Sequence, residues 1–258
     1  MRIVFVTVDD VFYLPRFFSR VLPEWADETA AVVVLAPARS SKVTARRAYT
    51  LYGPWGVLWN SSRYVFRTFG SRLGPWVPRW RDLSVAGIAG RHHIPVYRPQ
   101  SVNHPDFVAH LRHDVKPDLV VSVAAPEIFR DTLLCLPPMG CINVHGAMLP
   151  RYRGMLPSFW TLLHGESEGG VTVHYMSAGI DDGAIIAQRK FPIVHGDTVD
   201  SLIRRSKTVG AELLCDVLQK LKDGRITTFP NNSREGTYHS FPTRQDVRRL
   251  KALGRRVM

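Results

Sequence analysis

The chain has 258 residues, of which 45% are hydrophobic and 22% are charged, a composition typical of a globular protein with a sizeable buried core. It excludes a mainly disordered chain and makes a disulfide scaffold unnecessary. The net charge of +12 indicates an anionic partner, but the excess is confined to two segments. Residues 37–92 hold ten Lys or Arg and one acid, and residues 242–258 hold six and one.

The three cysteines are Cys135, Cys141 and Cys215, and their spacing fits neither a C-x-x-C pair nor a zinc site. We therefore expect reduced thiols in a cytoplasmic protein. The apolar run at residues 3–8 is too short for a secretory signal or a membrane span.

The first part of the chain alternates apolar runs with helical segments. Nearly continuous apolar runs are typical of parallel strands buried on both faces. We expect such strands at residues 2–8, 30–36, 94–97, 118–124 and 140–145. Helices are expected at 14–22 and 105–113. The pattern predicts an α/β fold with a doubly wound, mostly parallel, Rossmann-like sheet, whose ligands bind beyond the carboxyl ends of the strands.

The second part of the chain has a different order of elements. A helix is expected at 157–164, followed by a hairpin of strands 171–176 and 184–193 around a turn rich in Gly and Asp. A long helix to about Lys222 should follow, with Asp197 or Thr198 as its cap.

Residues 40–80 do not fit this alternation. They include seven basic residues and four of the six tryptophans, which are Trp55, Trp59, Trp76 and Trp80. Three interpretations stay open for this insertion: an amphipathic lid or homodimer surface, a membrane-surface patch, or a nucleic-acid surface.

Asn143 and His145 stand two residues apart at the end of a predicted strand, so both side chains point to one face. An amide donor beside a titratable ring suits a reaction in which negative charge develops on a carbonyl oxygen while a proton moves. The turn at 179–183 should place a carboxylate near the same sheet edge, where it would orient the histidine and raise its pKa. By itself, an N-x-H triplet is also compatible with a structural histidine.

The longer pattern is more specific. Residues 143–154 read Asn-Val-His-Gly-Ala-Met-Leu-Pro-Arg-Tyr-Arg-Gly, followed by Pro157, Trp160, Gly165-Glu166, Gly170-Val-Thr172 and Gly179-Ile-Asp181-x-Gly183. This series, dense over about residues 118–193, resembles the formyltransferase family that uses 10-formyltetrahydrofolate. That family includes glycinamide ribonucleotide, methionyl-tRNA and sugar N-formyltransferases, as well as formyltetrahydrofolate hydrolases.

The resemblance implies three catalytic residues and no metal. Asn143 would hydrogen-bond the formyl oxygen, and His145 would stabilise the developing charge and handle protons. Asp181 would couple to His145 and assist proton transfer between the amine and the folate nitrogen. Its neighbour Asp182 is interpreted as a solvated turn residue.

The resemblance also implies a folate pocket made of backbone groups and apolar side chains. One wall would be the loop after the strand 118–124, and the other would come from the next strand and the turn after residue 176. The residues expected to bind the folate are Pro126, Glu127, Ile128, Phe129, Cys141, Ser177, Ala178 and Gly179.

At some positions the sequence differs from members of this family, and these differences reduce the number of expected formyl acceptors. The segment 7–14 contains no glycine, which disfavours the phosphate-holding loop of glycinamide ribonucleotide formyltransferases. The roughly 35 residues after the long helix are too few for the carboxyl-terminal domain of methionyl-tRNA formyltransferases. Gly146 and Ala147 replace the Pro-Ser that commonly follows the histidine.

We expect a catalytic domain at residues 1–225, including the insertion, and a short extension at 226–258. In this extension Tyr238, Phe241 and Pro242 are expected to pack on the core. A solvated helix should carry Arg244, Arg248 and Arg249. These arginines, or Arg151 and Arg153, are alternatives for holding an anionic group.

The predicted reaction transfers a formyl group from 10-formyltetrahydrofolate to a primary amine of a small molecule, such as a nucleotide-linked amino sugar or a specialised metabolite. The alternatives are a hydrolase that releases formate and an enzyme acting on a tRNA-linked amine, which is disfavoured but stays open. A further alternative is a binding protein that has this fold but no catalytic activity. The sequence leaves open whether the protein forms a homodimer and whether it binds a membrane surface.

Overall fold

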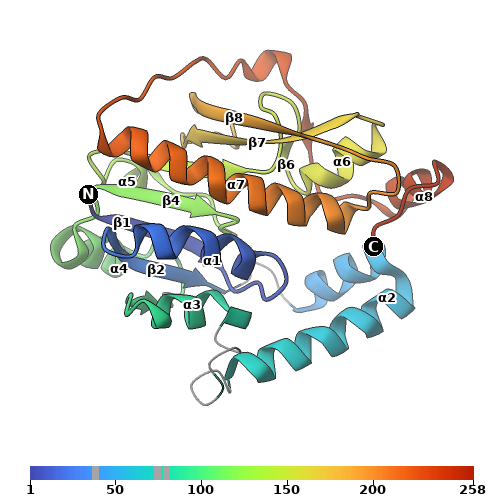
Figure 1. Cartoon of the computed structure of the whole chain (residues 1–258), viewed down its shortest axis with the longest axis horizontal. Helices are drawn as coiled ribbons and strands as arrows, with labels where there is room; N and C mark the ends of the chain where they lie inside the picture. Colours follow the sequence, from blue (N-terminus) through green and yellow to red (C-terminus); the bar gives the residue numbers. More distant parts are fainter. Residues whose placement is uncertain (37–40, 73–76, 78–81) are drawn as a thin grey trace.

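A seven-stranded sheet forms the centre of the computed structural model, which describes all residues except 37–40, 73–76 and 78–81 (Figure 1). Its strand order is β3-β2-β1-β4-β5-β7-β8. The parallel strands are β1 (Ile3–Val8), β2 (Thr29–Leu35), β3 (Val96–Tyr97), β4 (Leu119–Val123) and β5 (Cys141–His145). The antiparallel strands are β7 (Glu168–Tyr175) and β8 (Ile185–Pro192). The predicted α/β class with a mostly parallel sheet is confirmed.

The apolar run of β1 shows why these strands are central. Ile3 and Phe5 belong to one buried cluster, whereas Val4 and Val6 belong to a second cluster on the other face of the sheet. Successive side chains of a strand point to opposite faces, so an uninterrupted apolar sequence is stable only with cover on both sides.

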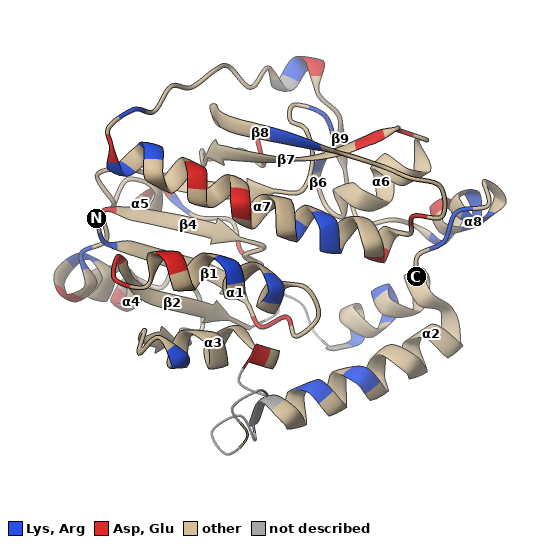
Figure 2. Cartoon of the chain, in the orientation of Figure 1, with Lys and Arg blue, Asp and Glu red and all other residues tan. Residues whose placement is uncertain are grey.

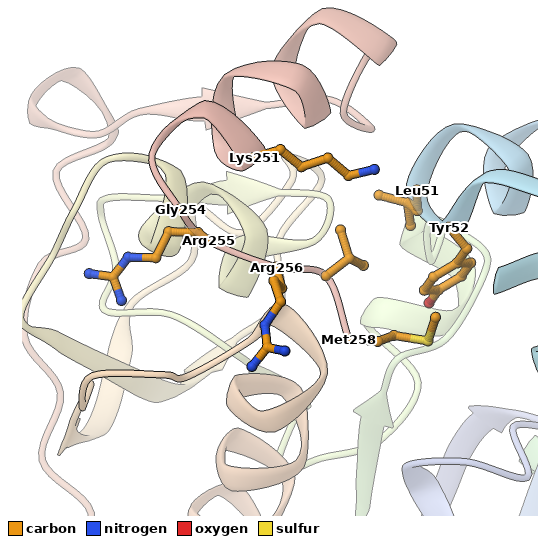
Figure 3. A pocket seen from close by; sticks show the side chains of 8 residues that line it. Leu51, Tyr52, Lys251, Gly254, Arg255, Arg256 and Met258 are labelled. Atoms are coloured by element: carbon orange, nitrogen blue, oxygen red, sulfur yellow. The ribbon is translucent and has the colours of Figure 1, made fainter. Parts of the chain in front are cut away.

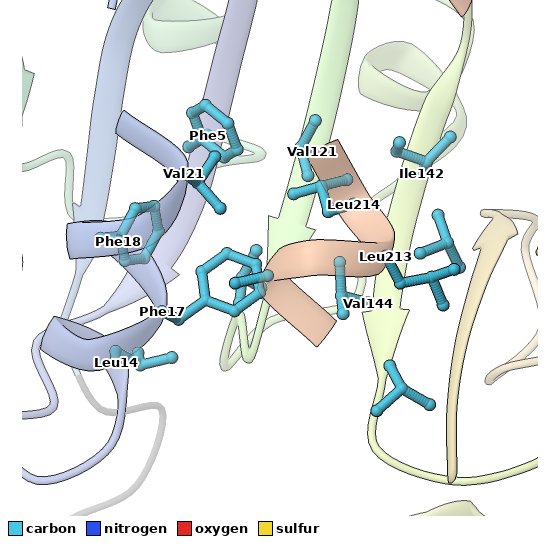
Figure 4. Packing of buried hydrophobic residues seen from close by; sticks show 14 of the residues in the cluster. Phe5, Leu14, Phe17, Phe18, Val21, Val121, Ile142, Val144, Leu213 and Leu214 are labelled. Carbon is cyan, nitrogen blue, oxygen red and sulfur yellow. The ribbon is translucent and has the colours of Figure 1, made fainter. Parts of the chain in front are cut away.

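Helices provide that cover on both faces. One face carries α1 (Leu14–Trp25), α3 (Val85–Arg91) and α7 (Val199–Lys222). The other carries α4 (Pro105–His110), the π-helical turn η2 (Leu111–Val115) and α5 (Asp131–Leu134). Figure 4 shows the larger core, where Phe17 and Phe18 of α1 pack beside Leu213 and Leu214 of α7 over the strands. Each such side chain contributes about 1.5–3 kcal/mol through burial.

Two predicted helices lie at the expected positions, and the structure adds how each one is built. The helix predicted at 105–113 changes from α4 to the π-helical turn after His110. The long helix α7 ends at Lys222 as predicted, and Thr198 is its cap, because its side chain accepts a hydrogen bond from the Ser201 N–H at 3.1 Å. Asp197 instead pairs with Arg205 at 2.8 Å.

The insertion forms one long helical element, α2 (Ser41–Arg72), which is broken at Gly53. Gly53 has φ 67° and ψ −178°, a conformation that favours glycine, and Pro54 then starts the second half. The tryptophans Trp76 and Trp80, named with the insertion above, lie outside the described residues.

The remaining elements lie near the end of the hairpin. They are β6 (Arg153–Gly154), α6 (Pro157–Leu163), the 3-10 turn Ser233–Glu235, β9 (Tyr238–His239) and α8 (Arg244–Ala252). Strands β6 and β9 pair in parallel as a small second sheet. No helix among the described residues is long and apolar enough to cross a membrane.

The tail of the chain follows the prediction except at Tyr238. Pro242 is buried and Phe241 packs against the core, while the three arginines of α8 are exposed as expected. Tyr238 is 56% exposed, so the expectation that it packs on the core is wrong. It lies in β9, which pairs with β6 rather than with the main sheet.

Candidate active site

Four polar side chains lie on one face of neighbouring strands β5 and β7. The antiparallel register pairs Asn143 with His174, and His145 with Thr172. Both histidines are almost fully buried, at 6% and 2% exposure. Thr172 accepts the Leu149 N–H at 3.1 Å and donates to the Ala147 carbonyl at 2.7 Å, which fixes the loop after β5.

Asp181 joins this group from the turn between β7 and β8. Its Oδ2 lies 3.5 Å from Nδ1 of His145, and its Oδ1 accepts from Nδ2 of Asn143 at 3.4 Å. The residue has φ 51°, in the left-handed region that Asp and Asn tolerate better than most side chains. The structure therefore brings together the three side chains that the sequence singled out.

The hydrogen bonds of His145 define which of its two ring nitrogens carries the proton. Its Nε2 lies 2.8 Å from the carbonyl oxygen of Tyr152, which can only accept, so Nε2 carries the proton. In the neutral ring, Nδ1 is then an unprotonated nitrogen facing Asp181. Burial lowers the pKa of His145 and outweighs the opposing effect of the Asp181 carboxylate, while Lys207 and His174 lower it further. The ring is therefore neutral near pH 7 and able to take up a proton.

Asp181 is ionised in this setting. Burial alone would raise its pKa, but the attraction between this carboxylate and a protonated His145, together with the Gly154 N–H, which donates to Oδ2 at 2.8 Å, holds that pKa well below the ordinary value. A fixed carboxylate beside a neutral imidazole can stabilise the imidazolium that forms when the ring accepts a proton.

His174 is a site residue that the sequence reasoning missed. Its Nδ1 lies 2.8 Å from the Tyr175 carbonyl, so this nitrogen carries the proton, and Nε2 accepts from Nδ2 of Asn143 at 3.2 Å. His174 therefore fixes the orientation of the Asn143 amide. The available signal was a histidine two residues after Thr172 in the strand predicted at 171–176, so that both side chains point to the same face.

The predicted folate-binding residues lie on two loops beside β5 and, for Cys141, on β5 itself. Phe129 and Cys141 are buried in the second core cluster, which Ala125 and Met176 contact. Glu127 accepts hydrogen bonds from Ser101 Oγ at 2.7 Å and the Val102 N–H at 3.2 Å, so its carboxylate holds the adjacent loop. Ile128 is 60% exposed. Pro126 is partly buried, and residues 177–179 are exposed on the other side of β5.

Charged residues near the turn have partners of their own. Asp182 accepts a hydrogen bond from Ser177 and lies 3.9 Å from Arg153, so it is held within the turn rather than only solvated. Arg153 also donates to the Ile180 carbonyl at 2.6 Å and 2.9 Å. Arg151 pairs with Glu166. The described residues hold no group of three or more His, Cys, Asp or Glu arranged for a metal ion.

The carboxyl-terminal extension reaches this site directly. Nδ2 of Asn231 donates to the carbonyls of Asp181 and Gly183 at 3.0 Å and 3.1 Å, which clamps the turn that carries Asp181. The loop that carries Tyr152 and Gly154 is held by the segment 237–239 through hydrogen bonds of 2.8–2.9 Å, from its backbone N–H groups to two backbone carbonyls and to the Thr237 hydroxyl. Sequence reasoning did not connect the extension with the site.

A cavity of about 380 Å³ lies between α2 and the end of the chain. Figure 3 shows Tyr52 pointing toward Met258, and Lys251 pointing toward Leu51. The three catalytic candidates are not part of its lining.

A mostly parallel sheet, with Asn143 and His145 on β5 and Asp181 in the turn after β7, defines an α/β protein with a candidate acyl- or formyl-transfer site. The profile of the formyl transferase family matches residues 17–218. The chain therefore belongs to the formyl transferase family.

Individual relatives agree with this assignment. The chain is 40% identical over 169 residues to the methionyl-tRNA formyltransferase of Pelobacter propionicus, which covers 66% of this chain and 50% of that protein. A sugar N-formyltransferase from a Shewanella species has a TM-score of 0.61 at 20% identity, covering 97% of this chain and 88% of that one. The N-formyltransferase from Helicobacter canadensis, solved with folinic acid and dTDP-3-aminofucose, has a TM-score of 0.58 at 21% identity, covering 95% and 72%. These two structures show the same fold, and the chain spans about half the length of the curated relatives that it matches.

Proposed function

We propose that this protein transfers a formyl group from 10-formyltetrahydrofolate to a primary amine. The observation that carries the proposal is the convergence of Asn143, His145 and Asp181, with a neutral histidine facing an ionised carboxylate. 10-Formyltetrahydrofolate supplies an activated formyl carbon. The residues present suit this reaction, because the Asn143 amide can donate a hydrogen bond to the formyl oxygen and His145 can accept the proton of the amine.

Each side chain has a distinct role in the proposed reaction. Asn143 Nδ2–H donates to the formyl oxygen, exchanging its long 3.4 Å hydrogen bond to Asp181 for this partner. His145 Nδ1 accepts the proton that the amine nitrogen loses as its bond to the formyl carbon forms. Asp181 stabilises the resulting imidazolium, and the proton then passes to the folate nitrogen as its bond to the formyl carbon breaks.

We propose the two loops beside β5 as the folate walls. Ile128 offers an exposed apolar side chain on one side, and residues 177–179 offer backbone groups on the other. Phe129 and Cys141 support these walls from the core. The solved relative from Helicobacter canadensis binds folinic acid, and this is consistent with such a pocket.

The leading acceptor is the amine of a small molecule, with a nucleotide-linked amino sugar as the first class to test. A methionyl-tRNA acceptor is the second candidate, because the 40% identity to methionyl-tRNA formyltransferases favours it. The net charge of +12 is compatible with either a nucleotide or a tRNA. We further propose residues 1–225 as the catalytic domain, with residues 226–258 as an extension that holds the turn of Asp181. We also propose a cytoplasmic location, in keeping with three free cysteines.

The experiment measures tetrahydrofolate and formate release from purified protein with 10-formyltetrahydrofolate. The reactions contain no acceptor, a panel of amines and nucleotide-linked amino sugars, or methionyl-tRNA. Tetrahydrofolate release that requires one acceptor class and yields its formamide supports the transferase and identifies that class. Equal tetrahydrofolate and formate without any acceptor would instead establish the hydrolase.

A further inference from the structure

The outer side of α2 carries a row of large apolar side chains exposed to solvent. Six of them, each between 62% and 79% exposed, make up what we call the α2 apolar face: Trp55, Leu58, Trp59, Val65, Phe66 and Phe69. Their spacing of three and four residues puts them on one stripe of the helix. A patch of this kind on a soluble protein marks an interaction surface.

The opposite side of the same helix is attached to the rest of the protein. The ring of Tyr64 lies 6.3 Å from that of Phe12, and the Arg63 guanidinium lies 5.4 Å from the Phe12 ring centroid. Asn60 donates to the sulfur of Met258 at 3.2 Å. The helix is therefore anchored through its polar side, and no described segment covers the α2 apolar face.

The charged residues of helix α2 are all of one sign. Residues 41–72 contain six Lys or Arg and no Asp or Glu, and Figure 2 shows α2 with basic positions and no acidic one. Lys42 and Arg46 are exposed. Helix α8, which contacts α2 where Arg244 lies 5.2 Å from the Tyr49 ring, adds further exposed basic residues.

The combination of exposed aromatic residues on α2 with exposed basic residues on α2 and α8 favours one kind of partner. Tryptophan is enriched where hydrocarbon meets water, because its ring is apolar and its N–H is polar. Basic residues beside such a row add attraction to anionic lipids. A second copy of this chain would instead bring two equally basic segments together. We propose that the α2 apolar face docks the protein on an anionic lipid bilayer, with the second half of α2 lying parallel to the membrane surface.

The second half of α2, residues 54–72, is about 28 Å long and can lie along the interface without spanning the membrane. Phe12, on its anchored side, belongs to the loop after β1. Arg47 of the first half lies 3.6 Å from the sulfur of Met155, next to the loop that holds Asp181. A docked bilayer would therefore lie roughly one helix diameter, about 10–12 Å, from loops at the catalytic edge.

The test is flotation of the purified full chain with vesicles of phosphatidylcholine alone or with 30% phosphatidylglycerol. We expect binding to the anionic vesicles, weaker binding to the neutral ones, and release as the salt rises from about 0.1 M to 0.5 M, because salt screens surface charge. Brominated lipids should quench the fluorescence of Trp55 and Trp59 in the bound protein, which reports insertion of the face itself.

Two variants and a matched control isolate the surface. The triple change Trp59→Ser, Phe66→Ser and Phe69→Ser removes exposed apolar area and should weaken binding at least roughly tenfold. Val194→Ser removes an apolar side chain of 52% exposure in the loop before α7 and should leave binding unchanged. Lys42→Glu with Arg46→Glu should reduce the preference for anionic vesicles. Circular dichroism and thermal melting confirm that each variant is folded.

The proposal is supported if anionic vesicles bind the wild type and the Val194→Ser control but not the triple variant. It is overturned if the wild type does not float with anionic vesicles, or if the triple variant floats equally well. Sedimentation equilibrium gives the competing outcome: a dimer that the triple variant abolishes, with no vesicle binding, would assign the face to a second copy. None of these readouts depends on the proposed formyl transfer.

Discussion

The Oδ2 atom of Asp181 lies 3.5 Å from Nδ1 of His145, and the same oxygen accepts the Gly154 N–H at 2.8 Å. The carboxylate is therefore fixed by the backbone before any substrate binds. Because Nε2 of His145 is committed to the Tyr152 carbonyl at 2.8 Å, the nitrogen that faces Asp181 is the one that can gain a proton. The pair is arranged for proton uptake at a single atom.

The first prediction concerns the charge of Asp181. Asp181→Asn keeps the size of the side chain and tolerates φ 51°, but it removes the anion that stabilises the imidazolium. We expect kcat to fall by about 10²–10³-fold with little change in KM. The matched control is Asp182→Asn, since Asp182 contacts Ser177 and Arg153 and not the histidine. Equal losses in both variants would contradict the proposed role.

The second prediction concerns pH. Burial holds the pKa of His145 below its ordinary value of about 6.5, so the neutral, proton-accepting form persists into mildly acidic solution. The kcat profile, which reports groups of the enzyme–substrate complex, should therefore stay level from about pH 8 to 6.5 and fall only below it. An acidic limb centred above pH 7 that does not move with the pKa of the acceptor amine would show that His145 is not the base.

The same shift affects stability. Burial lowers the pKa of His145 in the folded state, so the unfolded state binds this proton more tightly. The folded protein therefore loses stability as the pH falls through the pKa that His145 has in the unfolded state. The free energy of unfolding should decrease between pH 7.5 and 5.5. Urea denaturation of His145→Gln should show a smaller decrease, because glutamine does not titrate. An identical decrease in both proteins would exclude His145 as a source of this acid sensitivity.

The third prediction tests His174 as a positioning residue. His174→Phe removes the acceptor that holds Nδ2 of Asn143 at 3.2 Å, and we expect kcat to fall roughly tenfold or more while KM stays similar. His174→Gln restores an acceptor and should recover part of the loss. A purely structural role would lower thermal stability in both variants and leave the kcat of the folded protein unchanged.

Much of the fold and part of the site follow from the sequence alone. The apolar runs determine the strands, because a run without polar positions requires cover on both faces. The parity of Asn143 and His145 follows from strand geometry. His174 could not be assigned in the same way, since its position opposite Asn143 depends on the register of β5 and β7.

Other parts of the site give no side-chain signal. The Tyr152 carbonyl and the Gly154 N–H are backbone groups, and only the folded loop shows what they contact. Asn231 lies 50 residues from Asp181 in the chain. The alternation of strands and helices gave no assignment for the insertion, and the structure has over Ser41–Arg72 a helical element that Gly53 and Pro54 divide in two.

The fourth prediction concerns the folate wall. If Ile128 covers the bound donor, Ile128→Ala removes apolar contact area and should raise the KM for 10-formyltetrahydrofolate by about 5–20-fold, with kcat nearly unchanged. Val194→Ala, at a comparably exposed position of 52%, is the control and should leave both constants unchanged. A fall in kcat without a change in KM would place Ile128 outside the donor pocket.

The last prediction tests the contribution of the extension to the site. Asn231→Ala removes the hydrogen bonds to the Asp181 and Gly183 carbonyls, which cost about 1 kcal/mol each when lost. The catalytic turn should loosen, and because a small displacement of a reacting group is costly, kcat should fall about tenfold. The neighbouring Asn232→Ala is the matched control, since Asn232 contacts only Glu235 and Arg234 among the described hydrogen bonds of its side chain. Steady-state kinetics with thermal melting separates the two effects: if Asn231→Ala and Asn232→Ala have the same kcat, the clamp on the turn does not contribute to catalysis.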